Sequence, residues 1–184
     1  CSMRIIAGQL KGRTIAVPKN FKGRPTTDFA REGIMNMLHH EVDWHGLKVL
    51  DLFAGTGALG LECLSRGATS VTSVDGSPMH TRSIRDNFVQ FGFSSSRVVC
   101  ADVFKFIPKN QDSFDLILAD PPYDMKEIRE LPNLILNSAA VHRESLVVLE
   151  HHYKLNFEEH PQFHRTRTFS NVAFTFFRKE KVEL

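Results

Sequence analysis

The stretch VLDLFAGTGALG, residues 49–60, is an apolar run followed by a glycine-rich loop and the start of a helical pattern. Gly55, Gly57 and Gly60 form a G-x-G-x-x-G motif in it. Glycines placed directly after a strand let the backbone approach a bound nucleotide at the N-terminus of the next helix. The stretch therefore predicts a nucleotide-type site in an α/β fold, and a dinucleotide is the first candidate ligand.

Asp51, near the end of the predicted strand, argues against a dinucleotide. A carboxylate beside a pyrophosphate would be repelled by roughly 4 kcal/mol per close charge pair at an effective dielectric constant near 20. S-adenosylmethionine instead carries an α-ammonium and a sulfonium group beside its adenosine, and both groups suit an acid. A dinucleotide fingerprint also turns directly after its strand, whereas here LFA separates Asp51 from Gly55. Asp51 therefore favours S-adenosylmethionine; a capping acid beside a tight glycine turn is the structural alternative.

The rest of the chain alternates short apolar runs with helical patterns. Runs rich in Val, Ile and Leu suit a parallel sheet that is covered on both faces. We expect strands over 48–53, 70–75, 97–101, 114–119 and 145–150. We expect helices over 58–66, 78–91 and 126–137, a short one near Phe104, and one capped by Thr or Asp within TTD, residues 26–28. The order predicts an open α/β sheet with its ligand site at the carboxyl ends of the first strands.

Two short β-type patterns flank this region. RIIAGQLKGRTIAVP, residues 4–18, contains two β-type runs around a glycine turn and predicts a small hairpin. FHRTRTFSNVAFTFFRK, residues 163–179, predicts a closing antiparallel hairpin. We expect residues 1–25 to form a basic N-terminal arm and residues 26–184 to form the main domain.

The composition fits one globular domain: the chain has 184 residues, of which 42% are hydrophobic. Its net charge is only +2, but seven basic residues stand against one acid between Arg4 and Arg31. That segment predicts either a nucleic-acid contact or a solvated face. The three cysteines and nine histidines show no metal-ligand spacing, so we expect no metal site. The chain has no long apolar segment or export signal, so we expect a cytoplasmic protein without a membrane partner.

Two further acids follow predicted strands. Asp75 ends the second strand, where a carboxylate can accept hydrogen bonds from ribose hydroxyls. Asp102 follows the third strand; it could accept from the adenine amino group while the Val103 amide meets a ring nitrogen. Asp102 could equally cap the helix that starts at Val103. Both acids would lie at the same edge of the sheet as the glycine loop.

The segment ADPPYD, residues 119–124, ends the fourth predicted strand. Its two prolines, Pro121 and Pro122, fix the backbone in an extended form. The Asp120 side chain and the Pro121 carbonyl can then accept two hydrogen bonds from one exocyclic amine, and Tyr123 offers a face on which a base can stack. Two acceptors would localise the lone pair of an aromatic amine for attack on a methyl donor. An ordinary strand-ending turn is the structural alternative.

Together these residues resemble the class I S-adenosylmethionine-dependent methyltransferases. The resemblance rests on the D-x-F-A-G-x-G run from Asp51, on Asp75 and Asp102, and on D-P-P-Y, which is typical of enzymes that act on exocyclic nitrogen. RIIAGQLKGR, RPTTDFAREGIMNML and LDLFAGTGALGLECLSRGA also resemble the RsmD-type 16S ribosomal RNA guanine-N2 methyltransferases. This family resemblance implies a Rossmann-like, mostly parallel seven-stranded sheet with helices on both faces, and the cofactor S-adenosylmethionine. It also implies a guanine of ribosomal RNA as substrate, in an assembled or partly assembled small subunit.

The resemblance also assigns residues to roles. The expected cofactor-binding residues are Asp51, Phe53, Ala54, Gly55, Gly57, Asp75, Gly76, Asp102 and Val103. The expected catalytic residues are Asp120, Pro121, Pro122 and Tyr123. Arg24 and Thr26 would lie at the pocket mouth, with Arg4, Lys11 and Arg13 on RNA phosphates. Phe29 and Gly33 depart from the family pattern, and the glycine weakens its helix by roughly 1 kcal/mol.

Three other functions fit parts of the sequence. D-P-P-Y alone also fits an adenine-N6 methyltransferase on DNA or RNA. The glycine loop alone fits a dinucleotide-dependent oxidoreductase, and the basic arm alone fits a non-catalytic RNA-binding factor. We expect a monomer without an obligate protein partner.

Overall fold

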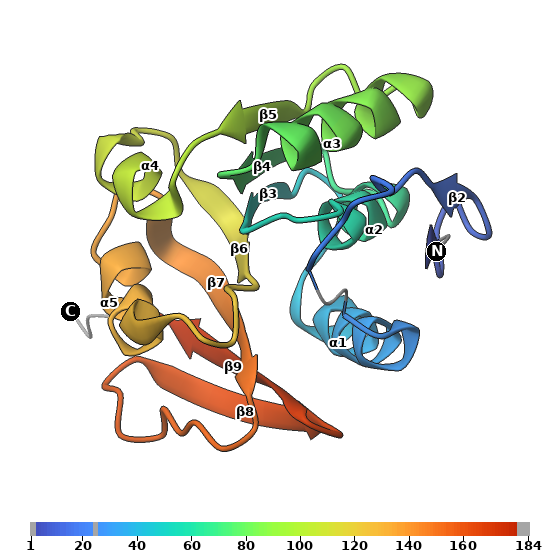
Figure 1. Ribbon diagram of the computed structural model, residues 1–184. Helices are drawn as coiled ribbons and strands as arrows, with labels where there is room; N and C mark the ends of the chain where they lie inside the picture. The colour runs from blue at the N-terminus through green and yellow to red at the C-terminus, as the bar shows by residue number, and fades with distance from the viewer. Residues whose placement is uncertain (1–2, 24–25, 180–184) are drawn as a thin grey trace.

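The computed structural model describes residues 3–23 and 26–179, and its centre is a seven-stranded sheet (Figure 1). The strands are β3 (Lys48–Leu52), β4 (Ser70–Asp75), β5 (Arg97–Cys100), β6 (Phe114–Ala119), β7 (Val141–His152), β8 (Phe163–Phe169) and β9 (Val172–Arg178). Their order is β5-β4-β3-β6-β7-β9-β8. The first five strands in this order pair in parallel, and β9 and β8 add antiparallel pairs. The expected mostly parallel sheet and its closing hairpin are confirmed.

Helices cover both faces of this sheet (Figure 1). One face carries α1 (Asp28–Glu41), α2 (Ala58–Ser65) and α3 (Pro78–Gln90), and the other carries α4 (Val103–Lys109), the 3-10 helix η1 (Lys126–Arg129) and α5 (Leu131–Leu136). Alternate residues of β3 face opposite layers, with Val49 in the first core and Leu50 in the second. Both faces of the central strands are therefore buried, which explains their continuous apolar runs.

Polar side chains fix the starts of three helices. The Thr27 hydroxyl accepts a hydrogen bond from the Ala30 amide at 3.2 Å and caps α1. The Ser77 hydroxyl caps α3 in the same way, with Pro78 in the first turn. The Asp102 carboxylate accepts from the Phe104 amide at 2.8 Å and caps α4. These caps satisfy amides that have no partner within a helix.

Two expected elements differ from the structure. The single helix expected over 126–137 is wrong, because η1 and α5 are separate. Pro132 lies in the first turn of α5 and has no amide hydrogen to continue a helix from η1. The strand expected over 145–150 is longer in the structure, since β7 starts at Val141. Its pairing with β6 shifts its register between Phe114 and Leu116. Residues 142–144 are polar, so the apolar pattern did not predict this first part of the strand.

The N-terminal hairpin consists of β1 (Met3–Arg4) and β2 (Thr14–Ile15). Ile5 and Ile15 are each 1% exposed and belong to the core that contains α1 and α2. The turn passes so close to α2 that a Cβ on Gly8 would lie 1.9 Å from the Ser65 carbonyl oxygen. The hairpin is therefore fastened to the sheet domain by buried apolar contacts and by direct backbone packing.

The packing of α1 involves Phe29 and Gly33, the two residues that we expect to depart from the family pattern. A Cβ on Gly33 would lie 2.3 Å from Cε1 of Phe169, so the glycine leaves room for that ring. The Phe29 and Phe169 rings meet edge to face with their centroids 5.9 Å apart.

Within the described ranges, no helix has the length and apolar character needed to cross a membrane.

Candidate active site

A cleft of about 470 Å³ lies at the carboxyl ends of β3, β4 and β6. It is lined by Phe53 and Gly55 after β3, by Asp75 at the end of β4 with Gly76 after it, and by the segment from Asp120 to Tyr123 after β6. The glycine loop and D-P-P-Y, which are more than 60 residues apart in the sequence, therefore share one cavity. Parallel strands bring this about, because their carboxyl ends meet at one edge of the sheet.

A smaller recess continues from this cleft toward the sheet. Its lining contains Asp51, Ala54 and Thr26, together with Asp120, which the two cavities share. Asp51 is only 2% exposed, and its Oδ2 atom has no hydrogen-bond partner among the described residues. Burial and then the nearby Asp120 carboxylate raise the pKa of Asp51 well above its usual value. An acid in this state suits a cationic ligand group, which would supply the missing partner.

Asp75 holds the glycine loop in addition to facing the cleft. Its Oδ2 accepts a hydrogen bond from the Gly55 amide at 2.9 Å, and its Oδ1 accepts one from the Ser77 amide at 2.9 Å. The loop backbone is unusual, since Phe53 has φ 57° although it is not a glycine. A left-handed conformation at such a residue stores strain of the kind that gathers at functional sites.

Asp120 occupies the centre of the site. Its backbone amide donates to the Leu52 carbonyl at 3.3 Å, which ties D-P-P-Y to β3. Its Oδ2 lies 3.4 Å from the Thr26 hydroxyl, and burial raises the pKa of its carboxyl group to about 7. Tyr123 is 40% exposed and lines the cleft.

The sequence analysis did not identify Glu150 and Phe21 as residues of the site. Glu150 of β7 is 3% exposed, and its Oε2 accepts a hydrogen bond from the Thr26 hydroxyl at 2.9 Å. Phe21 lies in the segment before α1, lines both cavities and contacts the His80 ring with the centroids 4.9 Å apart. The only available signal for Glu150 was an acid at the end of an apolar strand; an isolated aromatic residue gave none for Phe21.

Three expected cofactor residues are not part of the lining of either cavity, although Thr56 and Ala58, the chain neighbours of Gly57, line the recess. Among the described residues, Gly57, Asp102 and Val103 do not line the cleft or its recess. Gly57 has φ 75° and packs on Ile84, so it serves the turn into α2. Asp102 caps α4, which was the alternative role expected for it, and Val103 is buried.

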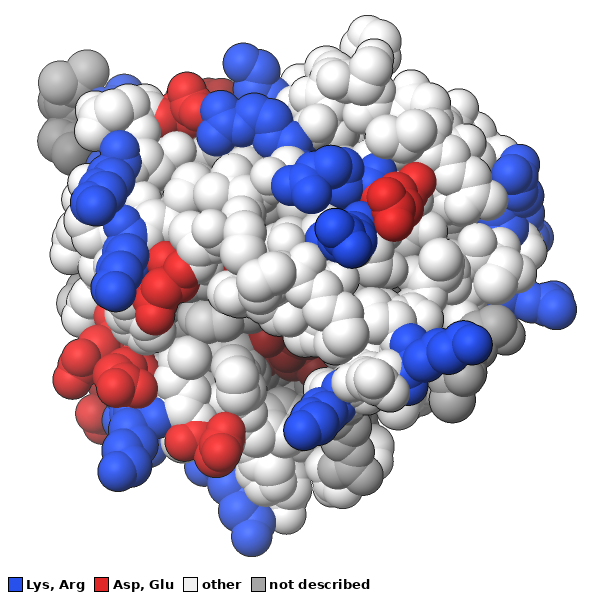
Figure 2. All heavy atoms as spheres, turned by 45° about the horizontal axis from the view of Figure 1, so that its top comes forward, with Lys and Arg blue, Asp and Glu red and all other residues white. Residues whose placement is uncertain are grey.

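The expected RNA-binding residues of the arm are exposed. Arg4, Lys11 and Arg13 all reach the surface, although the Arg13 guanidinium also lies over the Phe91 ring at 5.2 Å. Arg24 lies outside the described residues. Figure 2 shows Lys and Arg side chains spread over several parts of one face, with acidic atoms recessed in a hollow between them.

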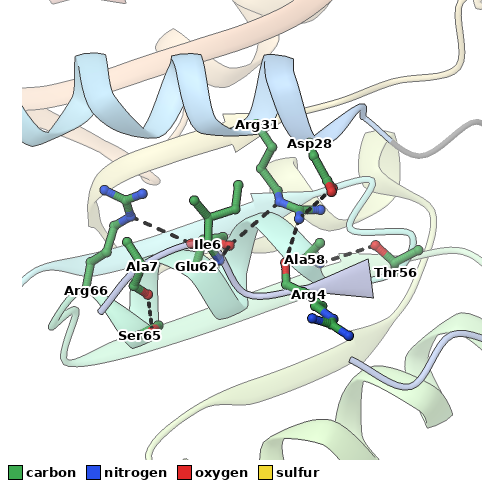
Figure 3. A network of polar contacts seen from close by, with 10 residues as sticks. All are labelled: Arg4, Ile6, Ala7, Asp28, Arg31, Thr56, Ala58, Glu62, Ser65 and Arg66. Carbon is green, nitrogen blue, oxygen red and sulfur yellow. Dashed lines mark hydrogen bonds and ion pairs between the residues drawn. The ribbon is translucent and has the colours of Figure 1, made fainter. Parts of the chain in front are cut away.

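A buried ionic network fastens the arm to α1 and α2 (Figure 3). The Arg31 guanidinium donates to the Arg4 carbonyl at 2.7 Å and lies 3.7 Å from the Glu62 carboxylate. Glu62 also accepts from the Ile6 amide and pairs with Arg66 at 3.7 Å. Arg31 and Glu62 are both completely buried. Removing one partner of such a buried pair is costly, because it leaves the other charge uncompensated.

The cavity fits S-adenosylmethionine in its donor chemistry. Asp51 offers an unpartnered buried carboxylate oxygen for a cationic methionine portion. Asp75 offers a carboxylate at the cleft for hydroxyl groups, and Gly55 and Gly76 let a ligand approach the backbone. A pyrophosphate would instead meet Asp51 and Asp120 in the joined cavities. These acids favour the methyl donor over a dinucleotide.

Comparison with known proteins agrees with this geometry. The family model Conserved hypothetical protein 95 matches residues 3–178. Ribosomal RNA small subunit methyltransferase D of Escherichia coli is 30% identical over 181 residues, which are 97% of this chain and 90% of the relative. The protein of the same name from Haemophilus influenzae is 31% identical over 152 residues, which are 80% of this chain and 78% of the relative.

A solved structure has the same architecture over almost its whole length. The yhhF protein of Escherichia coli, solved as a candidate methyltransferase, superposes with a TM-score of 0.84 at 29% identity. The superposition covers 98% of this chain and 99% of that one. The resemblance found in the sequence is thereby confirmed, and the chain belongs to the Conserved hypothetical protein 95 family, which contains RsmD-type methyltransferases.

Proposed function

We propose that this protein transfers a methyl group from S-adenosylmethionine to the exocyclic N2 amine of a guanine in small-subunit ribosomal RNA. The observation that carries the proposal is that the glycine loop and D-P-P-Y line the same cavity, so that a methyl donor bound by the loop would lie beside an amine bound by D-P-P-Y. The names of the relatives support ribosomal RNA as the substrate.

The cofactor would be held by the residues at the ends of β3 and β4. Asp51 would bind the cationic methionine portion, Asp75 the ribose hydroxyls, and the backbone around Gly55 and Gly76 would allow close approach. The bound cofactor supplies an electrophilic methyl group. Asp102 would accept from the adenine amino group and the Val103 amide would meet a ring nitrogen, in addition to the cap that Asp102 forms on α4.

The substrate base would be held by the segment after β6. The Asp120 carboxylate and the Pro121 carbonyl would accept the two hydrogens of the amine, which localises its lone pair toward the methyl donor. Tyr123 would stack on the base, while Pro122 keeps the segment rigid. The methylated amine then loses a proton, and Asp120 is placed to accept it. Ionised Asp120 is therefore the active form.

The RNA surface would extend from the cleft to the arm. Arg4, Lys11 and Arg13 would bind phosphates, and Thr26 would stand at the entrance of the recess. We propose that the protein acts in the cytoplasm as a monomer on an assembled or partly assembled small subunit, where a guanine is presented for extrusion into the cleft.

A methylation assay with three substrates tests this function. Transfer of labelled methyl groups should occur to small subunits, or to their naked RNA, from cells that lack the modification, and not to DNA. Nucleoside analysis should identify N2-methylguanosine; N6-methyladenosine would favour the alternative enzyme. Asp120→Ala should reduce transfer by at least about a hundredfold, whereas Asp124→Ala, at an exposed neighbouring acid, should leave it unchanged. Normal transfer by Asp120→Ala would contradict the proposed mechanism.

A further inference from the structure

Glu150 and Asp120 form a pair of acids that share one hydroxyl group. The Thr26 hydroxyl lies 2.9 Å from Oε2 of Glu150 and 3.4 Å from Oδ2 of Asp120. Glu150 comes from β7, Asp120 follows the neighbouring strand β6, and Thr26 precedes α1. Three separate segments of the chain therefore converge on one point at the inner end of the cleft.

If both acids are ionised, this arrangement has too few hydrogen atoms to form hydrogen bonds with all of the facing oxygen atoms. The Thr26 hydroxyl has a single hydrogen and can donate it to only one of the two carboxylates. The remaining oxygen atoms would then face each other as two negative charges in a buried site, which is unfavourable. One shared proton removes this repulsion, because a protonated carboxyl group can donate to its ionised neighbour.

The surroundings decide which acid keeps the proton. Glu150 is 3% exposed, and a small cavity beside it is lined by Ile34 and Met35 of α1, Leu59 of α2 and Phe174 of β9. The polar groups that face it are the Asp120 carboxylate and the hydroxyls of Thr26 and Tyr123. Asp120, in contrast, is partly exposed to the cleft. The proton therefore belongs on Glu150, and the charge on Asp120.

We propose that Glu150 is a positioning residue that remains protonated and keeps the Asp120 carboxylate ionised and directed at the substrate amine. This role rests on the proposed function, since Asp120 is the residue that would touch the base. Glu150 itself would not contact the substrate. When Asp120 accepts the proton of the methylated amine, it can return that proton to solvent through the cleft, and Glu150 keeps its own.

The directions in which burial and neighbouring charges shift the two pKa values agree with this assignment. Burial and then the Asp120 charge raise the pKa of Glu150 to about 9, whereas burial raises the pKa of Asp120 only to about 7. A hydrogen bond from Glu150 lowers the pKa of Asp120. The active form has one proton on Glu150 and none on Asp120. It is the main form at pH values between these two pKa values. Activity should rise as Asp120 ionises and fall again as Glu150 ionises.

Two substitutions at Glu150 separate positioning from mere stability. Glu150→Gln keeps a neutral hydrogen-bond donor of the same size, and Glu150→Leu keeps the volume without a polar group. The pH dependence of kcat is measured for both at saturating RNA and S-adenosylmethionine. We expect Glu150→Gln to stay within about threefold of wild type at neutral pH and to lose the alkaline fall in activity, because its amide cannot ionise. We expect Glu150→Leu to lower kcat by at least about tenfold with little change in KM.

Each outcome has a defined meaning. An unchanged alkaline fall in Glu150→Gln, or an unchanged kcat in Glu150→Leu, would overturn the role of Glu150. Failure of the wild-type protein to methylate guanine would instead overturn the proposed function. Binding of S-adenosylhomocysteine, measured by calorimetry, should be equal in wild type and Glu150→Gln, which shows that the cofactor site is intact. If Glu150→Leu does not fold, the pH profile of Glu150→Gln still decides the matter.

Discussion

The Asp75 carboxylate accepts a hydrogen bond from the Gly55 amide at 2.9 Å, so the acid that ends β4 holds the loop that follows β3. The same carboxylate accepts from the Ser77 amide and contacts the His80 ring. Asp75 thus orders the cavity wall besides offering oxygen atoms to a ligand. A residue with both roles should affect stability and binding together.

Replacing Asp75 by alanine should therefore produce a double loss. The Gly55 and Ser77 amides lose their acceptor, which should lower the free energy of unfolding by about 1–3 kcal/mol. The affinity for S-adenosylhomocysteine should fall by at least about tenfold, since the loop is no longer held and a ribose partner is absent. Urea unfolding and calorimetry measure the two effects. Asp86→Ala, at an exposed acid of α3, should show neither; tight binding by Asp75→Ala would contradict the proposed role.

Asp51 should lower the stability of the ligand-free protein at neutral pH and strengthen cofactor binding. Burial raises its pKa, so the folded protein holds this proton at pH values where the unfolded chain has lost it. Stability at this position therefore falls as the pH rises above about 4, the ordinary pKa of aspartic acid. Asp51→Asn should stabilise the ligand-free protein by about 1–2 kcal/mol at neutral pH, and this gain should shrink toward pH 4. Urea unfolding across this pH range measures it.

The same substitution should weaken cofactor binding. Loss of a charge-assisted contact should reduce the affinity for S-adenosylhomocysteine by roughly tenfold to a hundredfold. NADH should not bind to wild type or variant, because the Asp120 carboxylate, which both proteins keep in the cleft, repels its phosphates. Calorimetry at one pH tests both ligands, with Asp86→Asn as the matched control. NADH binding without S-adenosylhomocysteine binding would support the oxidoreductase alternative.

The arm residues should determine the salt dependence of RNA binding. Replacing Arg4, Lys11 and Arg13 together by glutamine removes three positive charges from the exposed hairpin. The slope of log affinity against log salt should decrease by about 2 for single-stranded RNA. Filter binding over a salt series measures the slope. Glutamine at Lys109, Arg143 and Lys179, which are all exposed and lie outside the arm, is the control. Equal slopes for both variants would remove the arm from the RNA surface.

Gly33 and Phe169 should show strong energetic coupling. Alanine at an ordinary helix position gains about 1 kcal/mol over glycine, but a Cβ at Gly33 would overlap the Phe169 ring. Gly33→Ala should therefore destabilise the protein, by about 1 kcal/mol net. In a Phe169→Ala background the same change should be stabilising. Urea unfolding of the four proteins gives the coupling energy, and Asn36→Ala, at an exposed position of α1, reports the helix propensity alone.

Local sequence patterns determined most of the secondary structure. Short apolar runs with caps such as Thr27, Ser77 and Asp102 predicted nearly all helices and strands, because capping and burial act over a few residues. The split between η1 and α5 was missed, although Pro132 marked it. The start of β7 was missed because residues 142–144 are polar and exposed or half-buried, and because the pairing with β6 shifts its register there.

The sequence by itself determined the chemistry of the two motifs: an acid before a glycine loop suits a cationic donor, and D-P-P-Y suits an amine. The tertiary structure alone decided which groups meet. It brought Glu150 and Asp120 to the same hydroxyl group, that of Thr26. It also left Gly57 and Asp102 outside the lining of the cleft and packed Phe169 on Gly33. The physical reason is that burial and proton sharing depend on neighbours from distant segments, whereas residue type and spacing report only local chemistry.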